Sequence, residues 1–207
     1  MKLKYPINLH KGSTAIFVLG LMYYYQNFSI GPWVYLALHG SYGFLWLLKD
    51  RMFPDKQWEK VVSVPYGIFV FLILGLYWIA PWLLISQRIE PRVEIISAAI
   101  VLNMFGVMLH YGSDAQKYFT LKYKSGLITE GYFSRCRNIN YLGELMIYSG
   151  FALLTVSWVG FIGIVAFFVG AFIPNMIKKD KSLSRYPEFG EYKKHSGLLL
   201  PKLKTFG

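Results

Sequence analysis

The sequence predicts an all-α fold: a polytopic membrane bundle of about six transmembrane helices, with the N- and C-termini in the cytoplasm. Composition is the first reason, because 55% of the 207 residues are hydrophobic and only 16% are charged, against about 25% charged in an ordinary soluble domain. The second reason is that apolar stretches long enough to cross a bilayer, roughly 20 residues, recur along the chain. The third is the one-sided placement of the basic residues.

In chain order, the six predicted spans cover residues 12–28, 32–48, 65–86, 93–111, 139–156 and 158–176. The span over 65–86 is the clearest, since it is almost wholly apolar. The first two spans are separated by only a few residues, as are the last two, which predicts two tight helical hairpins.

The basic residues predict the orientation of these spans. With six spans, 20 of the 22 lysines and arginines fall on one side of the membrane, and only Arg88 and Arg92 fall on the other. Because basic loops stay in the cytoplasm, that side is the cytoplasmic one. A bacterial inner membrane and the endoplasmic reticulum both fit this bias. The net charge of +11 is thus explained by topology and lipid headgroups, and we expect no nucleic-acid partner.

The distribution of polar residues predicts where function lies. Residues 1–207 form a single membrane domain, in which residues 1–100 have few polar groups inside spans. Residues 101–207 are dense in charge, Tyr, His and Gly. The single cysteine, Cys136, excludes a disulfide framework and a multi-cysteine metal site, so no metal is expected.

The segment from 110 to 144 is the most polar part of the chain at membrane depth. His110 and Asp114 lie at the end of the fourth span, and Asn140 and Glu144 lie four apart at the start of the fifth, on one helix face. A carboxylate at the depth of Glu144 is costly unless it is paired or hydrogen-bonded. It either pairs with Arg135 or Arg137, or it helps to hold a polar cofactor.

Four segments carry a family resemblance. GSDAQKY, GLITEGYFSRCRNINYLGEL, LLTVSWVG and RYPEFGEYKKHSGLLLP, within residues 112–201, resemble the C-terminal half of the steroid 5-alpha-reductase-like (DUF1295-type) membrane enzymes. More distantly they resemble the isoprenylcysteine and phospholipid methyltransferases. The resemblance implies residues 1–100 as substrate-side helices and residues 101–207 as a cofactor-binding half.

The resemblance also implies the residues of the cofactor site. In the reductases this half binds NADPH on the cytoplasmic side, so its nicotinamide and ribose would be lined by His110, Asp114, Asn140, Tyr141 and Glu144. The phosphates would meet Arg135, Arg137, Lys178, Lys179 and Arg185, and Arg suits them through its bidentate geometry. Tyr192, with Tyr186, would pack on the adenine or fix the tail.

The N-terminal half would hold the proton donor. The family uses an acidic residue late in the first span and a tyrosine in the second, whose nearest counterparts here are Gln26 and Tyr42. His39 shares a helix face with Tyr42. We expect Tyr42 to polarise a substrate carbonyl, steered by Gln26 or His39. The alternatives are a packing role for Tyr42 and a helix–helix hydrogen bond for His39.

Three functions stay open on these grounds. The first is an NADPH-dependent reductase of a carbon–carbon double bond in a lipophilic, steroid- or isoprenoid-like substrate taken from the bilayer. The second is an S-adenosylmethionine-dependent methyltransferase acting on a lipid or prenylcysteine, and the third is a non-catalytic membrane protein. The Ser113–Asp114 pair and the absence of a His-Pro in the RCRNINY turn favour the reductase. The oligomeric state is not predicted.

Overall fold

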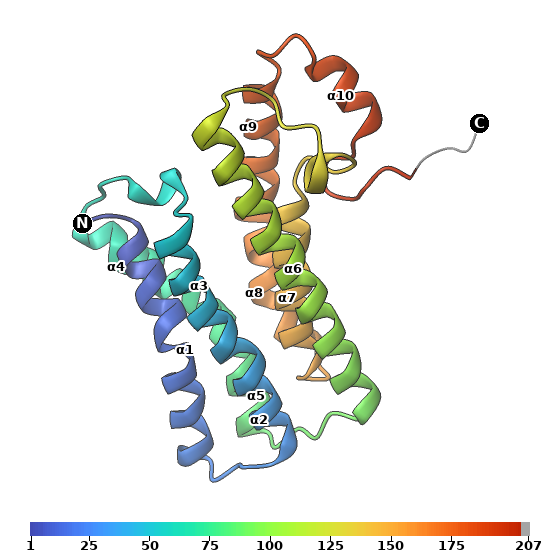
Figure 1. The fold of residues 1–207 in the computed structure, drawn as a ribbon. Helices are drawn as coiled ribbons and strands as arrows, with labels where there is room; N and C mark the ends of the chain where they lie inside the picture. The colour runs from blue at the N-terminus through green and yellow to red at the C-terminus, as the bar shows by residue number, and fades with distance from the viewer. Residues whose placement is uncertain (204–207) are drawn as a thin grey trace. The chain divides into compact units, whose positions relative to one another are not determined.

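The structure is a computed structural model that describes residues 1–203 (Figure 1). Within these residues every regular element is helical, apart from two isolated bridges, Lys2–Val61 and Cys136–Gly197. The predicted all-α class is confirmed. The α-helices are α1 (Lys4–Tyr24), α2 (Ile30–Tyr35), α3 (Ser41–Met52), α4 (Val64–Leu74), α5 (Ile79–Ser86), α6 (Val93–Tyr123), α7 (Ile139–Leu153), α8 (Ile162–Phe167), α9 (Ile173–Leu183) and α10 (Phe189–His195).

Short 3-10 and π segments join several of these helices end to end. A π-helical turn, Leu36–Gly40, joins α2 to α3, and another, Phe168–Phe172, joins α8 to α9. The 3-10 turn Gly75–Trp78 joins α4 to α5. Further 3-10 turns lie at Lys56–Glu59, Gly131–Phe133 and Trp158–Phe161. Most residues of each predicted span are therefore helical, although residues 25–28 and 154–156 lie beyond the ends of α1 and α7.

Three helices within the described part are long and apolar enough to cross a membrane: Val64–Ser86, Val93–Tyr123 and Trp158–Leu183. The other three predicted spans lie on helices that differ from these in length or polarity. α7 has 15 residues, which corresponds to about 22 Å of helix. α1 carries Lys4 and Lys11, which lower its mean hydropathy.

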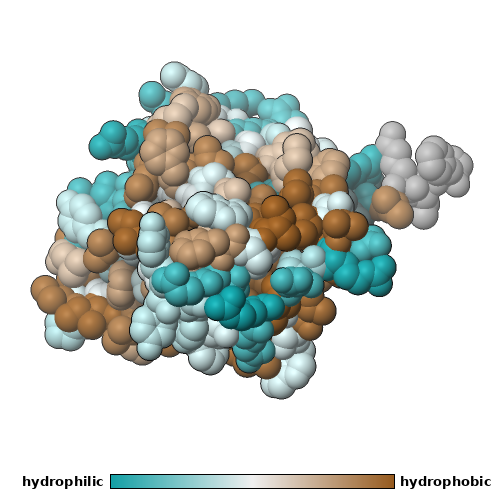
Figure 2. Space-filling view, turned by 90° about the horizontal axis from the view of Figure 1, so that it is seen from below, coloured by the Kyte–Doolittle hydropathy of each residue, from teal (hydrophilic) through white to brown (hydrophobic). Residues whose placement is uncertain are grey.

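The surface agrees with a membrane environment. Large apolar side chains are exposed on the long helices, among them Phe69 and Leu72 on α4, Met104 and Phe105 on α6, and Val169 after α8. Figure 2, seen from below, shows brown apolar residues beside white and teal ones. Large exposed apolar side chains along helices of this length are typical of contact with lipid.

The described chain divides into two compact units, which we describe separately. Unit 1 comprises Met1–Asn103 and Tyr148–Ile164, and unit 2 comprises Met104–Ile147 and Val165–Gly207. α6, α7 and α8 thus each contribute residues to both units. Unit 1 includes the end of α7 and the turn that follows it.

In unit 1, α1 packs closely on α3 (Figure 1). Gly43 permits the approach, because a Cβ at this position would overlap the backbone carbonyl oxygen of Lys11. At the start of the chain, the Leu3 amide donates to the Lys60 carbonyl at 2.9 Å and the Val62 amide donates to the Met1 carbonyl at 2.8 Å. These bonds hold the start of the chain against residues 60–62.

In unit 2, α6 and α7 come close enough for backbone contact. A Cβ on Gly143 would lie 2.5 Å from the His110 amide nitrogen and 2.7 Å from the Gly106 carbonyl oxygen. A Cβ on Gly106 would lie 2.7 Å from the Gly143 carbonyl oxygen. Two glycines facing each other let these helices approach more closely than larger residues allow, and this sets the position of the polar side chains around His110.

Candidate functional site

Tyr42, the predicted proton donor, lies in unit 1 beside a buried lysine, Lys11, which is 3% exposed. Its Nζ donates hydrogen bonds to the hydroxyl oxygens of Tyr42, at 3.4 Å, and Tyr148. The same nitrogen lies 4.7 Å from the ring centre of Tyr42, 4.9 Å from Trp46, 4.8 Å from Tyr148 and 5.8 Å from Tyr77. Ring faces at these distances attract a cation. The ammonium is therefore held by aromatic groups from three different segments.

The rings around Lys11 hold the two phenols in place. Tyr148 stacks on Tyr77 with ring centres 3.8 Å apart, and it meets Tyr42 edge to face at 5.8 Å. Tyr42 is fully buried, and Tyr148 is 3% exposed. Both hydroxyls are thus fixed in a dry environment, where each polar contact is stronger than in water.

His39 lies beside this cluster. It is 1% exposed, its ring stacks on Phe151 at 4.1 Å, and its centre is 6.3 Å from that of Tyr42. Nδ1 is hydrogen-bonded to the Tyr35 hydroxyl at 2.9 Å. Among the described residues, no hydrogen-bond partner reaches its buried Nε2, which is costly unless a ligand supplies one.

Gln26 does not lie with Tyr42, contrary to our expectation. It follows the end of α1 with φ 48°, and its exposed side chain donates to the Tyr23 carbonyl at 2.6 Å. Helix α1 ends at Tyr24, which is about 20 Å along the helix axis from Lys11. The structure therefore gives Tyr42 a different polar partner, Lys11, which sequence reasoning assigned only to the membrane-orienting charges.

The polar residues of α6 and α7 gather in unit 2 as the sequence predicted. His110 is 4% exposed and Asp114 8% exposed, and His110 Nδ1 is hydrogen-bonded to the Asn140 carbonyl at 3.1 Å. Asp114 and Glu144 are both close enough to interact electrostatically with Tyr111. The structure thus brings His110, Asp114, Asn140 and Glu144 together, and we name these four residues the α6–α7 polar cluster.

Two buried oxygen atoms in this region are unsatisfied. Within the described part of the chain, neither Asn140 Oδ1 nor Asn138 Oδ1 has a hydrogen-bond partner. Each can accept a hydrogen bond from an amide or a hydroxyl group of a ligand. Tyr141, one residue further along α7, packs instead against Phe172 with ring centres 4.8 Å apart.

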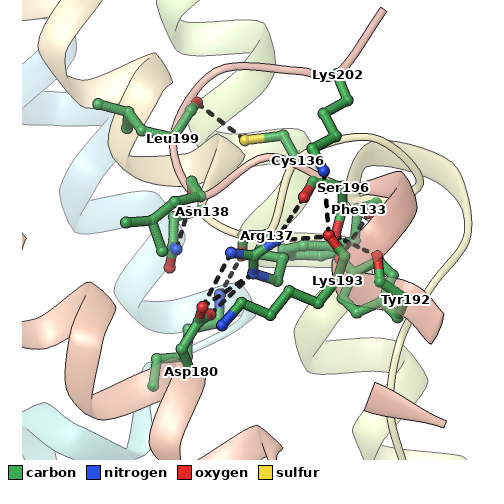
Figure 3. Close-up of polar contacts among 12 residues, drawn as sticks. Phe133, Cys136, Arg137, Asn138, Asp180, Tyr192, Lys193, Ser196, Leu199 and Lys202 are labelled. Carbon is green, nitrogen blue, oxygen red and sulfur yellow. Dashed lines mark hydrogen bonds and ion pairs between the residues drawn. The ribbon is translucent and has the colours of Figure 1, made fainter. Parts of the chain in front are cut away.

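Arg137, a predicted phosphate ligand, is committed to the structure of unit 2 (Figure 3). It is 4% exposed and makes a bidentate pair with Asp180, in which Nε–Oδ1 and Nη2–Oδ2 are both 2.9 Å. Its Nη1 donates to the Ser196 carbonyl at 2.5 Å. With these bonds the guanidinium is satisfied by protein groups, so phosphate binding through it would require breaking a buried pair.

Lys179 and Tyr192 have similar roles. Lys179 Nζ donates to the Arg137 carbonyl at 2.6 Å and lies over the Phe133 ring at 5.3 Å. The Tyr192 hydroxyl donates to the Phe133 carbonyl at 2.7 Å. Burial raises the pKa of Tyr192 to about 12. Tyr192 was predicted either to pack on the adenine or to fix the tail, and its hydrogen bond to Phe133 fixes the tail.

A C-terminal segment completes this arrangement, as Figure 3 shows. The Arg137 amide donates to the Gly197 carbonyl and the Gly197 amide donates to the Arg135 carbonyl, each at 2.9 Å. Asn138 Nδ2 donates to the Leu198 carbonyl, and the Cys136 thiol donates to the Leu199 carbonyl, both at 2.9 Å. We call this set, with the Arg137–Asp180 pair, the unit 2 clamp.

The side chains of the remaining predicted phosphate ligands, Arg135, Lys178 and Arg185, make none of the hydrogen bonds of the clamp. In the described structure, the side chains of half-buried Arg135 and exposed Lys178 make no hydrogen bond or ion pair. Exposed Arg185 donates to Ser182 Oγ at 3.0 Å and to the Tyr186 hydroxyl at 3.1 Å. Arg135 and Lys178 are therefore the predicted cations most available to an anion.

Tyr186 lines a pocket in unit 2. This pocket has a volume of about 390 Å³ and is bounded by the end of α6, by residues 124–130 and by Glu188. Lys124 is the one basic residue of its lining, against Glu130 and Glu188. Because the pocket is lined by one basic and two acidic side chains, it offers an anion little net electrostatic attraction.

Sequence reasoning missed three residues at these sites. Lys11 was counted as a topological charge, Tyr148 as part of an apolar span, and Asp180 as one residue of a basic tail. The only signal for Lys11 was a lysine directly before an apolar stretch, which snorkelling explains equally well. No local pattern marks Asp180 as the partner of a residue 43 positions earlier.

Fold and site together define a helical protein with three helices long and apolar enough to cross a membrane, a buried phenol–ammonium cluster and a polar cluster between two closely packed helices. A family model, described as "Protein of unknown function (DUF1295)", matches residues 49–196. The chain belongs to this family. Neither the curated proteins nor the solved structures compared with the chain contain a match.

Proposed function

We propose that the chain is a membrane-embedded, NADPH-dependent reductase of a carbon–carbon double bond conjugated to a carbonyl in a lipophilic substrate. The observation that carries this proposal is the pair of buried phenols bound to the Lys11 ammonium. A positioned phenol is a suitable acid for a carbonyl oxygen that gains negative charge, and methyl transfer needs no such acid. Membership of a family that includes steroid 5-alpha-reductase-like proteins supports the proposal further.

The α6–α7 polar cluster fits the nicotinamide and ribose. Asn140 Oδ1 is a buried acceptor without a partner among the described residues, and a carboxamide offers N–H donors of the kind it lacks. The carboxylates of Asp114 and Glu144 would accept from ribose hydroxyls. Arg135 and Lys178 would meet the phosphates, in place of Arg137 and Lys179. When bound, the cofactor supplies the hydride.

The residues of unit 1 supply the acid and the dry surroundings. The Tyr42 hydroxyl donates to the substrate carbonyl, which draws electrons from the double bond and makes its far carbon electron-poor. The carbonyl then carries enolate charge until the neighbouring carbon takes a proton. Burial of Tyr42 excludes water from this oxygen, and this strengthens the hydrogen bond that stabilises the charge.

The location of the protein follows from the same proposal. A lipophilic substrate reaches the chain from the bilayer, and the cofactor reaches it from the cytoplasm. We propose that the three long apolar helices act with the helices of residues 12–28, 32–48 and 139–156 as a six-span bundle. Both termini would then face the cytoplasm of a bacterial cell, or the cytoplasmic side of the endoplasmic reticulum.

The decisive experiment is cofactor-dependent thermal stabilisation of the detergent-purified protein, with NADPH, NADH and S-adenosylmethionine measured side by side. A ligand at 100 times its dissociation constant stabilises by about 2.7 kcal/mol. We expect a higher Tm with NADPH. A shift with S-adenosylmethionine alone would make the chain a methyltransferase, since the same acceptors suit its ammonium and ribose. No shift with any of them would favour the non-catalytic alternative.

Two substitutions separate the cofactor site from the acid. Glu144→Gln should abolish the Tm shift with NADPH, whereas Glu188→Gln, which lies outside the α6–α7 polar cluster, should leave the shift unchanged.

Tyr42→Phe should lower kcat by about 100-fold or more, the range typical of a lost general acid, without changing the affinity for NADPH. Tyr66→Phe, an exposed tyrosine of α4, is its control.

A further inference from the structure

The last described segment of the chain, residues 198–203, exposes apolar side chains to its surroundings. Leu198, Leu200 and Leu203 are 37%, 67% and 91% exposed, and Pro201 is exposed as well. Loops are usually rich in polar residues, and an exposed apolar group of this kind marks contact with another protein or with a membrane. We name residues 198–203 the leucine segment.

Hydrogen bonds to other parts of unit 2 satisfy several backbone groups of the leucine segment. Three groups are bonded in this way: the Leu198 carbonyl, the Leu199 carbonyl and the Lys202 amide. Their partners come directly before α7: Asn138 Nδ2 and the Cys136 thiol, both at 2.9 Å, and the Arg135 carbonyl, at 3.0 Å. Lipid offers a backbone no hydrogen bonds. These bonds therefore lower the cost of placing an irregular segment in lipid.

Gly197 turns the chain sharply just before the leucines. Its amide donates to the Arg135 carbonyl and its carbonyl accepts from the Arg137 amide, each at 2.9 Å. A Cβ on Gly197 would lie 1.9 Å from the Leu200 carbonyl oxygen, so the turn requires glycine. These contacts hold the backbone toward unit 2 and leave the Leu198 and Leu200 side chains on its outer side.

The leucine segment lies at the level where α7 and α9 meet polar surroundings. Its partners come directly before α7, and Arg137 among these residues is paired with Asp180 near the end of α9. On α9, exposed Ile177 is followed at once by exposed Lys178. Such a change from apolar to basic surface is typical of the boundary between acyl chains and headgroups. In Figure 1 the segment leaves unit 2 sideways at this level, away from α6 and α9.

Basic side chains flank the leucines. Lys202 Nζ donates to the Lys193 carbonyl at 3.4 Å (Figure 3) and to the Lys194 carbonyl at 2.9 Å, which brings its charge to the end of α10. Lys194 is paired with Glu191 at 2.8 Å. The exposed side chain of Lys193 makes no hydrogen bond or ion pair within the described chain. Lys193 and Lys202 thus place positive charge beside the leucines, and anionic headgroups attract such charge.

We propose that the leucine segment is an interfacial anchor that inserts Leu198, Leu200 and Leu203 among the acyl chains of an anionic leaflet. Lys193 and Lys202 meet the lipid phosphates. Apolar side chains flanked by lysines are typical of segments that lie in the membrane interface, and the level of the segment in unit 2 favours lipid over a soluble protein partner. The anchor does not depend on the proposed reductase function.

A fluorescent label on the full chain tests this contact. In a Cys136→Ser background, Leu200→Cys is labelled with the environment-sensitive dye NBD. Tyr123→Cys is the matched control, since Tyr123 is 79% exposed but lies about 20 Å beyond His110 along α6, outside the predicted span. Each protein is placed in nanodiscs of phosphatidylcholine with or without phosphatidylglycerol. Both leaflets then have the same composition, so the result does not depend on orientation.

We expect the emission of the Leu200 label to shift to shorter wavelength and to be quenched by lipids spin-labelled near the headgroup. The Tyr123 label should show neither effect. A Leu200 label that matches the control in wavelength and in quenching would overturn the anchor and would leave the leucines to a protein partner. If Leu200→Cys does not fold, as judged by its Tm, the same label at Leu203→Cys decides between these outcomes.

The role of the lysines is tested with the same label. Leaving out phosphatidylglycerol should reduce the quenching at Leu200, and Lys193→Gln should reduce it in nanodiscs that contain phosphatidylglycerol. Lys56→Gln, which removes an exposed lysine of unit 1, should leave the quenching unchanged. Equal quenching with and without phosphatidylglycerol would overturn the recognition of anionic lipid.

Discussion

Most of the N–H donors of the Arg137 guanidinium are hydrogen-bonded to other groups of the protein. Its guanidinium is buried and paired with Asp180, so Asp180→Asn would leave a buried charge without its counter-ion. Breaking a buried pair from one side costs about 3–5 kcal/mol. We expect the Tm of the purified protein to fall sharply. Glu191→Gln, which removes the exposed ion pair between Glu191 and Lys194, should leave Tm nearly unchanged, and an equal effect of the two would contradict a structural role for Arg137.

Tyr192 gives unit 2 a dependence on alkaline pH. Burial raises the pKa of its hydroxyl from about 10 to about 12, so folding favours the protonated form. The associated stability is complete below pH 10 and is lost as pH rises from about 10 to about 12. Tyr192→Phe should be less stable at neutral pH and should lack this part of the alkaline decline. Thermal unfolding across the pH range measures both effects.

Single residues are where sequence reasoning and structure diverge most. Of the residues predicted for the cofactor site, His110, Asp114, Asn140 and Glu144 lie close together, and their role in binding a cofactor stays a prediction. The phosphate ligands were harder to predict, because the local sequence does not distinguish an arginine that binds a phosphate from one that binds an aspartate. Arg137 and Lys179 are distinguished from Arg135 and Lys178 only by contacts across tens of residues.

The contact between α6 and α7 is the critical one among the helices. Gly143 lies against backbone atoms of Gly106 and His110, which cannot move aside as a flexible side chain can. Gly143→Ala should therefore lower stability by about 1–3 kcal/mol, the usual cost of overpacking, and should also weaken NADPH binding by displacing His110. Gly190→Ala is the control, because nothing lies within 4 Å of its added Cβ. Equal Tm values for the two variants would contradict the close approach.

The start of α1 should respond to acid. The hydrogen bonds that Lys2 and Lys4 donate to the Glu59 carboxylate hold its pKa below the ordinary value. A carboxyl with a lowered pKa contributes stability above its ordinary pKa and loses it as pH falls through the lowered one. The protection factors of the Leu3 and Val62 amides against hydrogen exchange should therefore fall on acidification. Glu59→Gln should remove this acid response, and an unchanged response would point to another carboxylate.

Helix positions were predictable from the sequence, whereas their internal breaks were not. Apolar runs located the long helices approximately, because the bilayer requires about 20 such residues. However, α1 begins at Lys4 rather than at residue 12, and α6 continues to Tyr123 rather than ending at residue 111. The π turns before α3 and before α9 have no comparable signal, since they depend on packing within the folded chain. Even so, they rotate every side chain that follows them, including Tyr42 and Lys179.

The topology of the whole chain is a prediction that labelling can test. The lone cysteine can be replaced as Cys136→Ser, which keeps a donor for the Leu199 carbonyl. Single cysteines are then introduced at exposed Lys56, Lys193 and Arg92. In intact spheroplasts, a membrane-impermeant maleimide should label only the Arg92 position, because the other two lie on the predicted cytoplasmic side. Labelling of Lys193→Cys from outside would contradict the six-span arrangement.

Apolar stretches along the sequence predicted the all-helical fold and helices long enough to cross a membrane, but they did not indicate which segments pack together. The sequence analysis divided one membrane domain into two functional halves near residue 100. Unit 1 nevertheless includes residues 148–164, because Tyr148 packs on Tyr77 and binds Lys11. The apolar sequence of this span does not indicate that residues 148–164 pack with residues 1–103, and only the folded chain shows this packing.

The unit 2 clamp has a consequence for biosynthesis. Arg137 leaves the ribosome well before the residues that satisfy it, since Asp180 follows 43 positions later and Ser196 follows 59 positions later. The clamp therefore cannot form until the chain has been synthesised to Ser196. Any fragment that ends between residues 140 and 195 lacks at least one partner of this buried guanidinium.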